Sequence, residues 1–243
     1  MVKQMVEINT FCQRVLNKNF PSIPVHADIK TYSAPDNVFD LVFGGFPCQD
    51  VSIAGKQLGV INGKRSSLFY ELLRVFKESG ATFLVLENVL GLLRNGFREV
   101  LRSLSESGYD AEWQTISAAA LGAPHLRERI FLIAYPSSLQ FSKKPSPWSD
   151  QIRCQAAIAS TYPNSASSQR DRSAKRSPQK RTESLPSTGL NAWSNVSAPI
   201  CGVDARLPNR LNRLAALGNA IVPQCAAIAL MRVQYLAECA AKP

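Results

Sequence analysis

The chain has 243 residues, 45% of them hydrophobic, and a formal net charge of +10. This length and composition suit one large domain, or one domain and a small second one, around a real core. No apolar run approaches the about 18 residues of a membrane span, and the first residues lack the apolar core of a secretion signal. The positive charge favours a polyanionic partner, most simply nucleic acid, over an indifferent basic surface.

Six cysteines and two histidines limit the metal and disulfide chemistry that the chain supports. No pair of cysteines has the spacing of a zinc finger, so we expect no structural metal site. Without secretion we expect a reducing cytoplasm, in a bacterial or phage-encoded protein, and therefore no disulfides. A thiol such as that of Cys48 then stays free to react.

The first part of the chain alternates short strands with one helix. The pattern predicts a strand over residues 2–8, a helix over 10–19 that Pro21 ends, and a strand over 25–29. Glu7 and Asp28 stand near the ends of the two strands, where acids in nucleotide-binding folds commonly hold ribose hydroxyls or base amino groups. A solvated loop acid is the competing interpretation for each.

A third strand over residues 40–43 leads into a turn that carries a cysteine. Gly44 and Gly45 allow the backbone to turn sharply, and Pro47 stiffens the exit toward Cys48. The cysteine thus lies just past a central strand, which is where ligands bind in open α/β sheets. A free cysteine is more often a small buried apolar residue, so this motif alone does not establish a nucleophile.

Strands and helices continue to alternate along the chain. A long connection over residues 50–65 has the length of a functional lid. After it we predict helices over 66–78, 96–107 and 222–239, with strands over 82–86, 111–117 and 130–135. The last two strands are candidates for an antiparallel pair. The alternation as a whole favours a mostly parallel, doubly wound sheet.

Four short motifs follow one another at the ends of these elements. They are Pro47-Cys48-Gln49, Glu87-Asn88-Val89, Arg127-Glu128-Arg129 and Gly218-Asn219-Ala220-x-Val222. In this order and spacing the chain resembles the DNA (cytosine-5)-methyltransferases, outside about residues 136 to 195. The resemblance implies an α/β fold of the S-adenosylmethionine-dependent methyltransferase type, with a doubly wound, mostly parallel sheet whose first strand is missing and a small irregular basic insertion.

The resemblance also implies a role for each catalytic side chain. Cys48 would attack C6 of a cytosine as a thiolate, the most reactive neutral-pH nucleophile among side chains. Glu87 would supply a proton or a short hydrogen bond at N3 of the base. Arg127 would bind O2, and Arg129 would hold Glu87 or the thiol loop. Without the resemblance, Arg-Glu-Arg before a strand reads equally well as a surface ion-pair cluster.

Cofactor and DNA contacts are implied in the same way. Glu7 would hold the ribose hydroxyls of S-adenosylmethionine and Asp28 its adenine amino group. The other cofactor-binding residues would be Ile29, Pro47, Leu68, Asn219 and Ala220. The partner would be double-stranded DNA with its cytosine flipped out of the stack, bound by a monomer. The DNA contacts would come from Gln49, Ser52, Asn88, Arg170, Arg172, Lys175 and Arg176, with Asn88 also ordering the loop around the site.

Three segments divide the chain: 1–135 as the catalytic domain, 136–195 as a short target-recognition or linker segment, and 196–243 as a part that packs back on the catalytic domain. Residues 136–195 are poor in aliphatic side chains and hold nine Lys or Arg against three acids, a local charge of +6. A disordered basic linker and a DNA-reading segment both fit this composition. We expect phosphate contacts here.

Two departures from the family pattern concern the cofactor and the base. No Phe-x-Gly-x-Gly loop precedes Glu7, and His125-Leu126 stands where the family more often has Gln before a basic residue. A fragment, a misplaced gene start or a decayed copy each accounts for the first departure, and we expect weak cofactor binding. A non-catalytic DNA-binding remnant therefore competes with a methyltransferase. A tRNA-methylating relative is a more distant alternative, because its cysteine motif differs from Pro-Cys-Gln.

Overall fold

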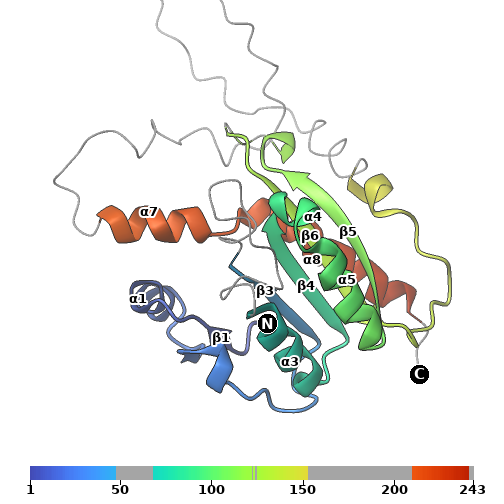
Figure 1. Cartoon of the computed structure of the whole chain (residues 1–243), viewed down its shortest axis with the longest axis horizontal. Coiled ribbons are helices and arrows are strands. Elements are labelled where there is room, and N and C mark those ends of the chain that lie inside the picture. The colour runs from blue at the N-terminus through green and yellow to red at the C-terminus, as the bar shows by residue number, and fades with distance from the viewer. Residues whose placement is uncertain (48–67, 122, 124, 153–209, 241–243) are drawn as a thin grey trace, which may run out of the picture.

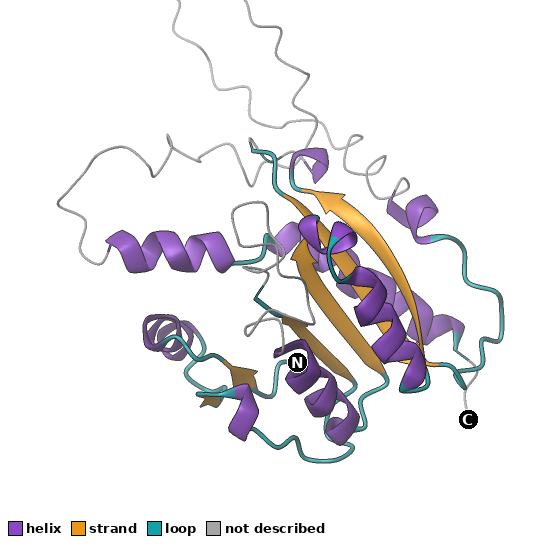
Figure 2. Cartoon of the chain, viewed as in Figure 1, coloured by secondary structure: helices purple, strands orange, loops and turns teal. Residues whose placement is uncertain are grey.

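The structure, a computed structural model, describes residues 1–47, 68–121, 123, 125–152 and 210–240. These residues form two β-sheets with helices around them (Figures 1 and 2). The strands are β1 (Met5–Val6), β2 (Val25–His26), β3 (Leu41–Gly45), β4 (Phe83–Val89), β5 (Tyr109–Ser117) and β6 (Glu128–Pro136). The helices are α1 (Thr10–Asn19), α3 (Leu68–Ser79), α4 (Gly91–Arg94), α5 (Phe97–Glu106), α7 (Arg210–Asn219) and α8 (Pro223–Cys239), with two 3₁₀ turns, η1 (Ile29–Thr31) and η2 (Ala119–Leu121).

The larger sheet has four strands in the order β3-β4-β6-β5. β3 and β4 are parallel, from Leu41 opposite Phe83 to Gly45 opposite Glu87. β6 runs antiparallel to both of its neighbours, which confirms the expected antiparallel pairing of the last two strands. The described sheets are less parallel than expected, because β5 and β6 are joined by a short connection that returns the chain directly.

Both faces of the larger sheet are covered, as a doubly wound α/β fold requires. Along β4, Leu84 and Leu86 join the cluster made with α3 and α5, while Phe83 and Val85 join the cluster made with α8. Figure 1 shows α5 on one side of the sheet and α8 on the other. Alternate strand side chains point to opposite faces, so each face receives its own apolar layer. Burying one such side chain fully contributes about 1.5–3 kcal/mol.

A buried ion pair fixes α8 to the sheet. The side chain of Arg232 on α8 is 2% exposed, and its Nε and Nη2 donate to the two carboxylate oxygens of Glu112 on β5 at 2.5 and 2.7 Å. Its Nη1 donates to the carbonyl of Ser146 at 2.9 Å. Two parallel charge-assisted bonds give this contact geometric specificity. The helix therefore has one defined position against β5.

The run from Leu211 to Cys239 is long and apolar enough to cross a membrane by length and composition alone. This is weak evidence, because the core helix of a globular protein meets the same criteria. The run includes α7, α8 and the non-helical residues 220–222 between them. The α8 part packs against the sheet through Ile228, Val233 and Leu236. Of the most apolar window in this run 24% is buried, so packing against the sheet covers only part of its apolar surface.

Residues 137–152 lie against α8. Trp148 is buried in the same cluster as the inner face of that helix, and Phe141 forms a β-bridge with Ala240. The first part of the basic segment is therefore joined to the core in this structure. The remainder of that segment, residues 153–195, lies outside the described residues.

The smaller sheet consists only of β1 and β2, paired in parallel from Met5 opposite Val25. It shares no described strand pairing with the larger sheet, and no described strand pairs with the outer edge of β3. Phe43 on that edge strand is 38% exposed. In the part of the chain that the structure describes, the two sheets are therefore separate, and the absence of a central strand stays a prediction.

Candidate functional site

The ends of β3 and β4 bring Gly45, on the strand that leads to the cysteine motif, next to Glu87. Gly45 is paired with Glu87 across the two parallel strands, and Cys48 follows Gly45 by three residues, just outside the described part of the chain. A Cβ on Gly45 would lie 3.1 Å from both Oε2 and the carbonyl oxygen of Glu87. This is closer than an ordinary van der Waals contact. Glycine therefore leaves room for the Glu87 carboxyl group at the end of the cysteine strand.

Glu87 forms an ion pair with the second arginine of the Arg-Glu-Arg motif. Arg129 Nε lies 2.9 Å from Glu87 Oε1, and the two side chains are 19% and 16% exposed. The family resemblance implied this contact as one of two alternatives. Burial raises the pKa of the Glu87 carboxyl, and the positive charges of Arg129 and Arg127 partly oppose that rise. The carboxyl therefore stays protonated to a higher pH than an exposed glutamate does.

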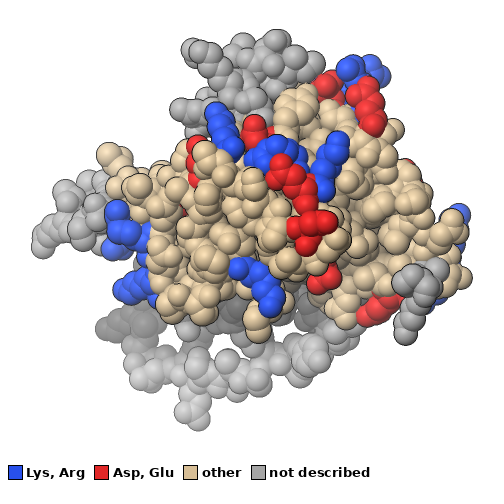
Figure 3. All heavy atoms as spheres, turned by 90° about the horizontal axis from the view of Figure 1, so that it is seen from below, with Lys and Arg blue, Asp and Glu red and all other residues tan. Residues whose placement is uncertain are grey.

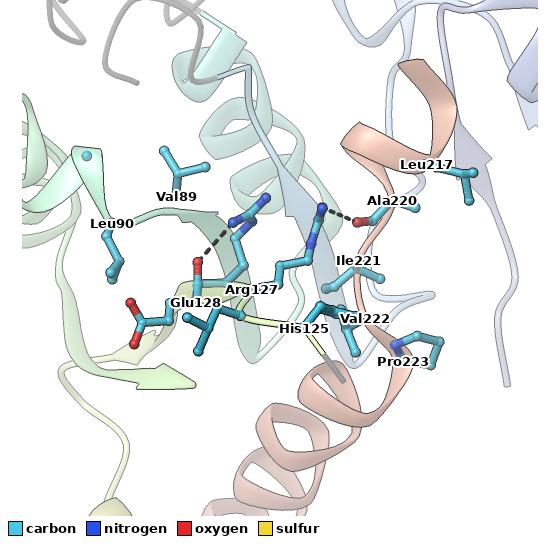
Figure 4. A pocket seen from close by; sticks show the side chains of 13 residues that line it. Val89, Leu90, His125, Arg127, Glu128, Leu217, Ala220, Ile221, Val222 and Pro223 are labelled. Atoms are coloured by element: carbon cyan, nitrogen blue, oxygen red, sulfur yellow. Dashed lines mark hydrogen bonds between the residues drawn. The ribbon is translucent and has the colours of Figure 1, made fainter. Parts of the chain in front are cut away.

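Arg127 contacts the connection between α7 and α8. Its Nη2 donates to the carbonyl oxygens of Gly218 at 2.9 Å and Ala220 at 2.5 Å, and Figure 4 shows the second bond. Its Nε is buried and has no hydrogen-bond partner among the described residues. Burial, and next the charge of Arg129, lower the pKa of Arg127. The side chain thus holds the end of α7 and Ala220 in place, while its Nε is left without a hydrogen-bond partner among the described residues.

A cavity of about 820 Å³ lies where the end of β4, the start of β6 and the α7–α8 connection meet. A ligand pocket typically measures about 300–1,000 Å³, so a flipped base or part of a cofactor fits this size. Its lining residues are Val89, Leu90, Gly91, His125, Leu126, Arg127, Glu128, Arg129, Leu217, Ala220, Ile221, Val222 and Pro223 (Figure 4). The cavity therefore brings both predicted arginines together with Ala220.

Asn88 connects β4 to the segment that enters the cysteine motif. It is 4% exposed, and its Nδ2 donates to the carbonyl of Phe46 at 3.2 Å. Its Oδ1 accepts from the amide of Val89 at 2.9 Å. This arrangement supports the predicted ordering of the loop, and a direct contact between Asn88 and DNA stays a prediction. Pro47 follows Phe46 and is half-buried.

The residues predicted to hold the adenosine part of the cofactor lie on and next to the smaller sheet. Glu7 follows β1 and accepts the Asn9 amide at 2.7 Å through Oε1. Asp28 follows β2 and caps η1 by accepting the Lys30 amide at 3.0 Å through Oδ1. Each of these bonds uses one of two carboxylate oxygens, so both acids fit the recognition of hydroxyl or amino donors. Neither acid lines the cavity, and Ile29 beside Asp28 packs against the core.

Leu68 and Asn219 stand at helix ends. Leu68 opens α3 and is half-buried, while Asn219 closes α7 and is exposed. Ala220 follows directly and lines the cavity. The structure thus places Ala220 with the arginines, and it does not place Leu68 or Asn219 in the same cavity.

Seven predicted site residues lie outside the described part of the chain. They are the nucleophile Cys48 and the DNA-contacting residues Gln49, Ser52, Arg170, Arg172, Lys175 and Arg176. Their roles remain predictions.

Cys225 near the start of α8 is a feature of the site that sequence reasoning missed. It is 2% exposed, which agrees with its predicted place on a packing helix. Burial raises the pKa of its thiol, while the charges of Arg127 and Arg129 act to lower it and Glu87 acts to raise it. The charged groups of the site thus act on this thiol electrostatically, and burial favours its protonated form. Its place three residues after Val222, the last residue of the Gly-Asn-Ala-x-Val motif, is the signal that was available.

The family model C-5 cytosine-specific DNA methylase matches residues 3–203. The chain is 36% identical over 136 residues to the Type II methyltransferase M.Sau3AI of Staphylococcus aureus, which covers 51% of this chain and 33% of that protein. It is 34% identical over 158 residues to the Type II methyltransferase M.NgoBV of Neisseria gonorrhoeae, and this match covers 58% of this chain and 37% of that protein.

The chain thus spans about a third of the length of these curated relatives. Among solved structures, the S. pombe Dnmt2 methyltransferase superposes with a TM-score of 0.51 at 23% identity, over 67% of this chain and 50% of that one. This likeness concerns the fold alone, and it agrees with an α/β methyltransferase architecture. Because the family model covers most of the chain, the chain belongs to the C-5 cytosine-specific DNA methylase family.

Proposed function

We propose that this protein transfers a methyl group from S-adenosylmethionine to C5 of a flipped-out cytosine in double-stranded DNA, through a covalent bond between Cys48 Sγ and C6. The observation that carries the proposal is the half-buried Glu87 carboxyl, paired with Arg129 and lying opposite Gly45 at the end of the cysteine strand. A carboxyl with a raised pKa at this place suits a proton donor to the base.

The chemistry assigns one task to each group. The thiolate of Cys48 adds to C6, and electron density moves toward N3 and O2 of the ring. Glu87 donates a proton or a short hydrogen bond at N3, while Arg129 holds the carboxyl in place. The buried Nε of Arg127 is available for O2. Negative charge that develops on the ring thus meets positioned donors.

Bound S-adenosylmethionine supplies the electrophilic methyl group. Glu7 and Asp28 would hold its ribose and adenine, with Ile29, Pro47, Leu68, Asn219 and Ala220 around it. After methylation, C5 carries one hydrogen and one methyl group. A water molecule removes the C5 proton, the C5–C6 double bond re-forms, and Cys48 leaves as a thiolate.

A DNA-binding remnant with little catalysis is the second candidate function. The break between the β1–β2 sheet and the larger sheet favours it, because the adenosine-binding acids and the arginine cavity belong to different sheets. Binding energy for a cofactor depends on a preorganised set of contacts. An incomplete set of cofactor contacts binds the cofactor weakly, while the net charge of +10 still favours DNA.

Replacing Glu87 with glutamine tests the proposed acid. We expect Glu87→Gln to lower kcat/KM for methyl transfer by about 10²–10⁴-fold, because glutamine cannot donate a proton. The protonated fraction of Glu87 falls as the pH rises through its raised pKa. The ratio of wild-type to variant kcat/KM should therefore be largest at low pH and shrink as the pH rises. Transfer of a labelled methyl group to DNA across a pH series measures this ratio.

The matched control is Glu106→Gln, which changes an exposed acid at the end of α5. Its rate should equal that of the wild type at every pH. A ratio for Glu87→Gln that stays constant or grows with pH would show that the carboxyl does not act as a proton donor.

The basic segment carries a second prediction, about DNA affinity. On the face in Figure 3, the described acidic and basic side chains are interspersed, and no large basic patch stands out among them. Because residues 136–195 carry a local charge of +6, we expect them to supply many of the phosphate contacts. The slope of log affinity against log salt should flatten by about 0.9 for each contact removed. The residues to neutralise together are Arg170, Arg172, Lys175 and Arg176.

A control protein with four other exposed basic residues neutralised distinguishes local contacts from net charge. These residues are Lys3, Lys18, Lys77 and Arg98. Its salt dependence should change less, although its net charge changes equally. If the slope of log affinity against log salt were equal for the wild type and the basic-segment variant, that segment would be only a linker.

A further inference from the structure

The two sheets meet through a helix and a turn. No strand of the β1–β2 sheet pairs with a described strand of the larger sheet, and η1, which follows β2, contacts α3 instead (Figure 1). Asp28 and Ile29 lie at the start of this turn. The contact between η1 and α3 therefore determines where Asp28 and Ile29 lie relative to the larger sheet.

Arg74 on α3 joins the helix to this turn. Its Nη2 donates to the carbonyl of Ile29 at 2.7 Å and to that of Tyr32 at 3.0 Å. Glu71 accepts from its Nε at 2.9 Å, and Glu78 accepts from its Nη1 at 2.7 and 2.8 Å. Two acids on the same helix thus orient one guanidinium toward the backbone of a segment more than 40 residues earlier in the chain.

These bonds suit a role in positioning. A 3₁₀ turn of three residues has little stability of its own, and its carbonyl groups need partners. A guanidinium is planar and always charged, so its bonds to carbonyl oxygens are strong and directional. The Arg74 side chain is 32% exposed, so water only partly competes for it. Glu78 also accepts the amide of Ala34 at 3.4 Å, which extends the contact beyond the turn.

We propose that Arg74 is a positioning residue for the adenosine end of the cofactor. It fixes η1 on α3, and through η1 it sets the places of Asp28 and Ile29. Arg74 itself does not touch the cofactor in this account. The identity of the ligand rests on the proposed function, whereas the fixing of the turn rests on the hydrogen bonds of Arg74 alone.

The chain contains a closely matched control for this arginine. Arg102 on α5 has Glu99 three residues before it and Glu106 four residues after it, the same arrangement that Arg74 has with Glu71 and Glu78. The described partners of Arg102 are both on its own helix. Both variants, Arg74→Met and Arg102→Met, lose the ion pairs along their own helix, but only Arg74→Met loses the two bonds to the carbonyls of Ile29 and Tyr32. Comparing them therefore isolates the effect of losing those two bonds.

The experiment uses the full chain and two readouts. Hydrogen exchange reports the amides of Thr31 and Tyr32, which bond within the turn to Asp28 and Ile29. We expect Arg74→Met to speed their exchange by about tenfold or more, since local opening no longer breaks the Arg74 bonds. A saturation titration into the millimolar range gives the Kd for S-adenosylmethionine, which should rise by about tenfold. Arg102→Met should change neither quantity.

Two further measurements distinguish positioning from general destabilisation. DNA affinity and kcat at saturating cofactor should stay at wild-type values in Arg74→Met. Arg74→Lys keeps a cation that reaches one carbonyl at a time, so its exchange rates and Kd should fall between those of the wild type and Arg74→Met.

Equal exchange rates in Arg74→Met and Arg102→Met would overturn the proposal. Faster exchange with an unchanged Kd would also overturn it, since the turn would then be loosened without effect on the cofactor. Failure of the wild-type chain to bind S-adenosylmethionine would instead refute the cofactor assignment in the proposed function. The cofactor titration of the wild type tests the proposed function. The hydrogen-exchange comparison of the variants tests independently whether Arg74 fixes the turn.

Discussion

Cys48→Ala is expected to abolish the covalent adduct between this protein and DNA that contains 5-fluorocytosine. In the proposed reaction, once C5 carries the methyl group, the Sγ–C6 bond breaks by β-elimination as the C5 proton leaves. Fluorine at C5 does not leave as a proton does, so the adduct formed by the wild type should survive denaturation. A denaturing gel of protein incubated with this DNA and S-adenosylmethionine should show a shifted band that is absent for Cys48→Ala.

Cys225→Ala is the control for this experiment. Cys225 is buried on α8, and burial raises the pKa of its thiol, so it is a poor nucleophile. The adduct yield of this variant should equal that of the wild type. An adduct that persists undiminished in Cys48→Ala would show that Cys48 is not the nucleophile. Loss of the adduct in Cys225→Ala would make the Cys225 thiol the candidate nucleophile instead.

The second large effect concerns the outer edge of β3. We expect an added segment with one apolar strand and a Phe-x-Gly-x-Gly loop, fused ahead of β1, to strengthen S-adenosylmethionine binding by about a hundredfold or more. Such a strand would pair with β3, whose outer edge has no described strand partner, and would connect the two sheets. Its loop would add backbone donors to those of the existing pocket.

The same segment should raise the melting temperature by about 2–4 °C for each kcal/mol that the new strand contributes. It should also reduce aggregation, because an open strand edge is a template for pairing between chains. Calorimetry with and without cofactor measures both effects. The control is a segment of equal length with polar residues at the apolar strand positions and no glycine motif. Micromolar cofactor binding by the 243-residue chain alone would show that other residues already complete the pocket.

Local patterns predicted helices better than strand bounds. The helix Thr10–Asn19 agrees at both ends with the expectation, because apolar spacing and the stop at Pro21 are local signals. The strands expected over 2–8 and 25–29 are shorter, Met5–Val6 and Val25–His26, and Ile29 belongs to a 3₁₀ turn. β4 extends to Val89, three residues beyond its apolar run. The extension follows from pairing with β6 up to Arg129, which the strand's own residues do not reveal.

Contacts between distant residues could not be predicted in the same way. Arg127 contacts the backbone of Ala220, 93 residues later, and Arg232 pairs with Glu112, 120 residues earlier. Periodicity reports which face of an element is apolar and not which polar side chains meet across the fold. The motifs did place Arg129 near Glu87, because the resemblance implied a shared site.

The most direct test of the central claim is to locate the transferred methyl group. The protein is incubated with double-stranded DNA and millimolar S-adenosylmethionine that carries a deuterated methyl group, and the digested nucleosides are analysed by mass spectrometry. We predict labelled 5-methyl-2′-deoxycytidine in DNA treated with the wild type and none in DNA treated with Cys48→Ala. Label on the amino group of cytosine or adenine, transfer to tRNA in preference to DNA, or no transfer at all would contradict the account.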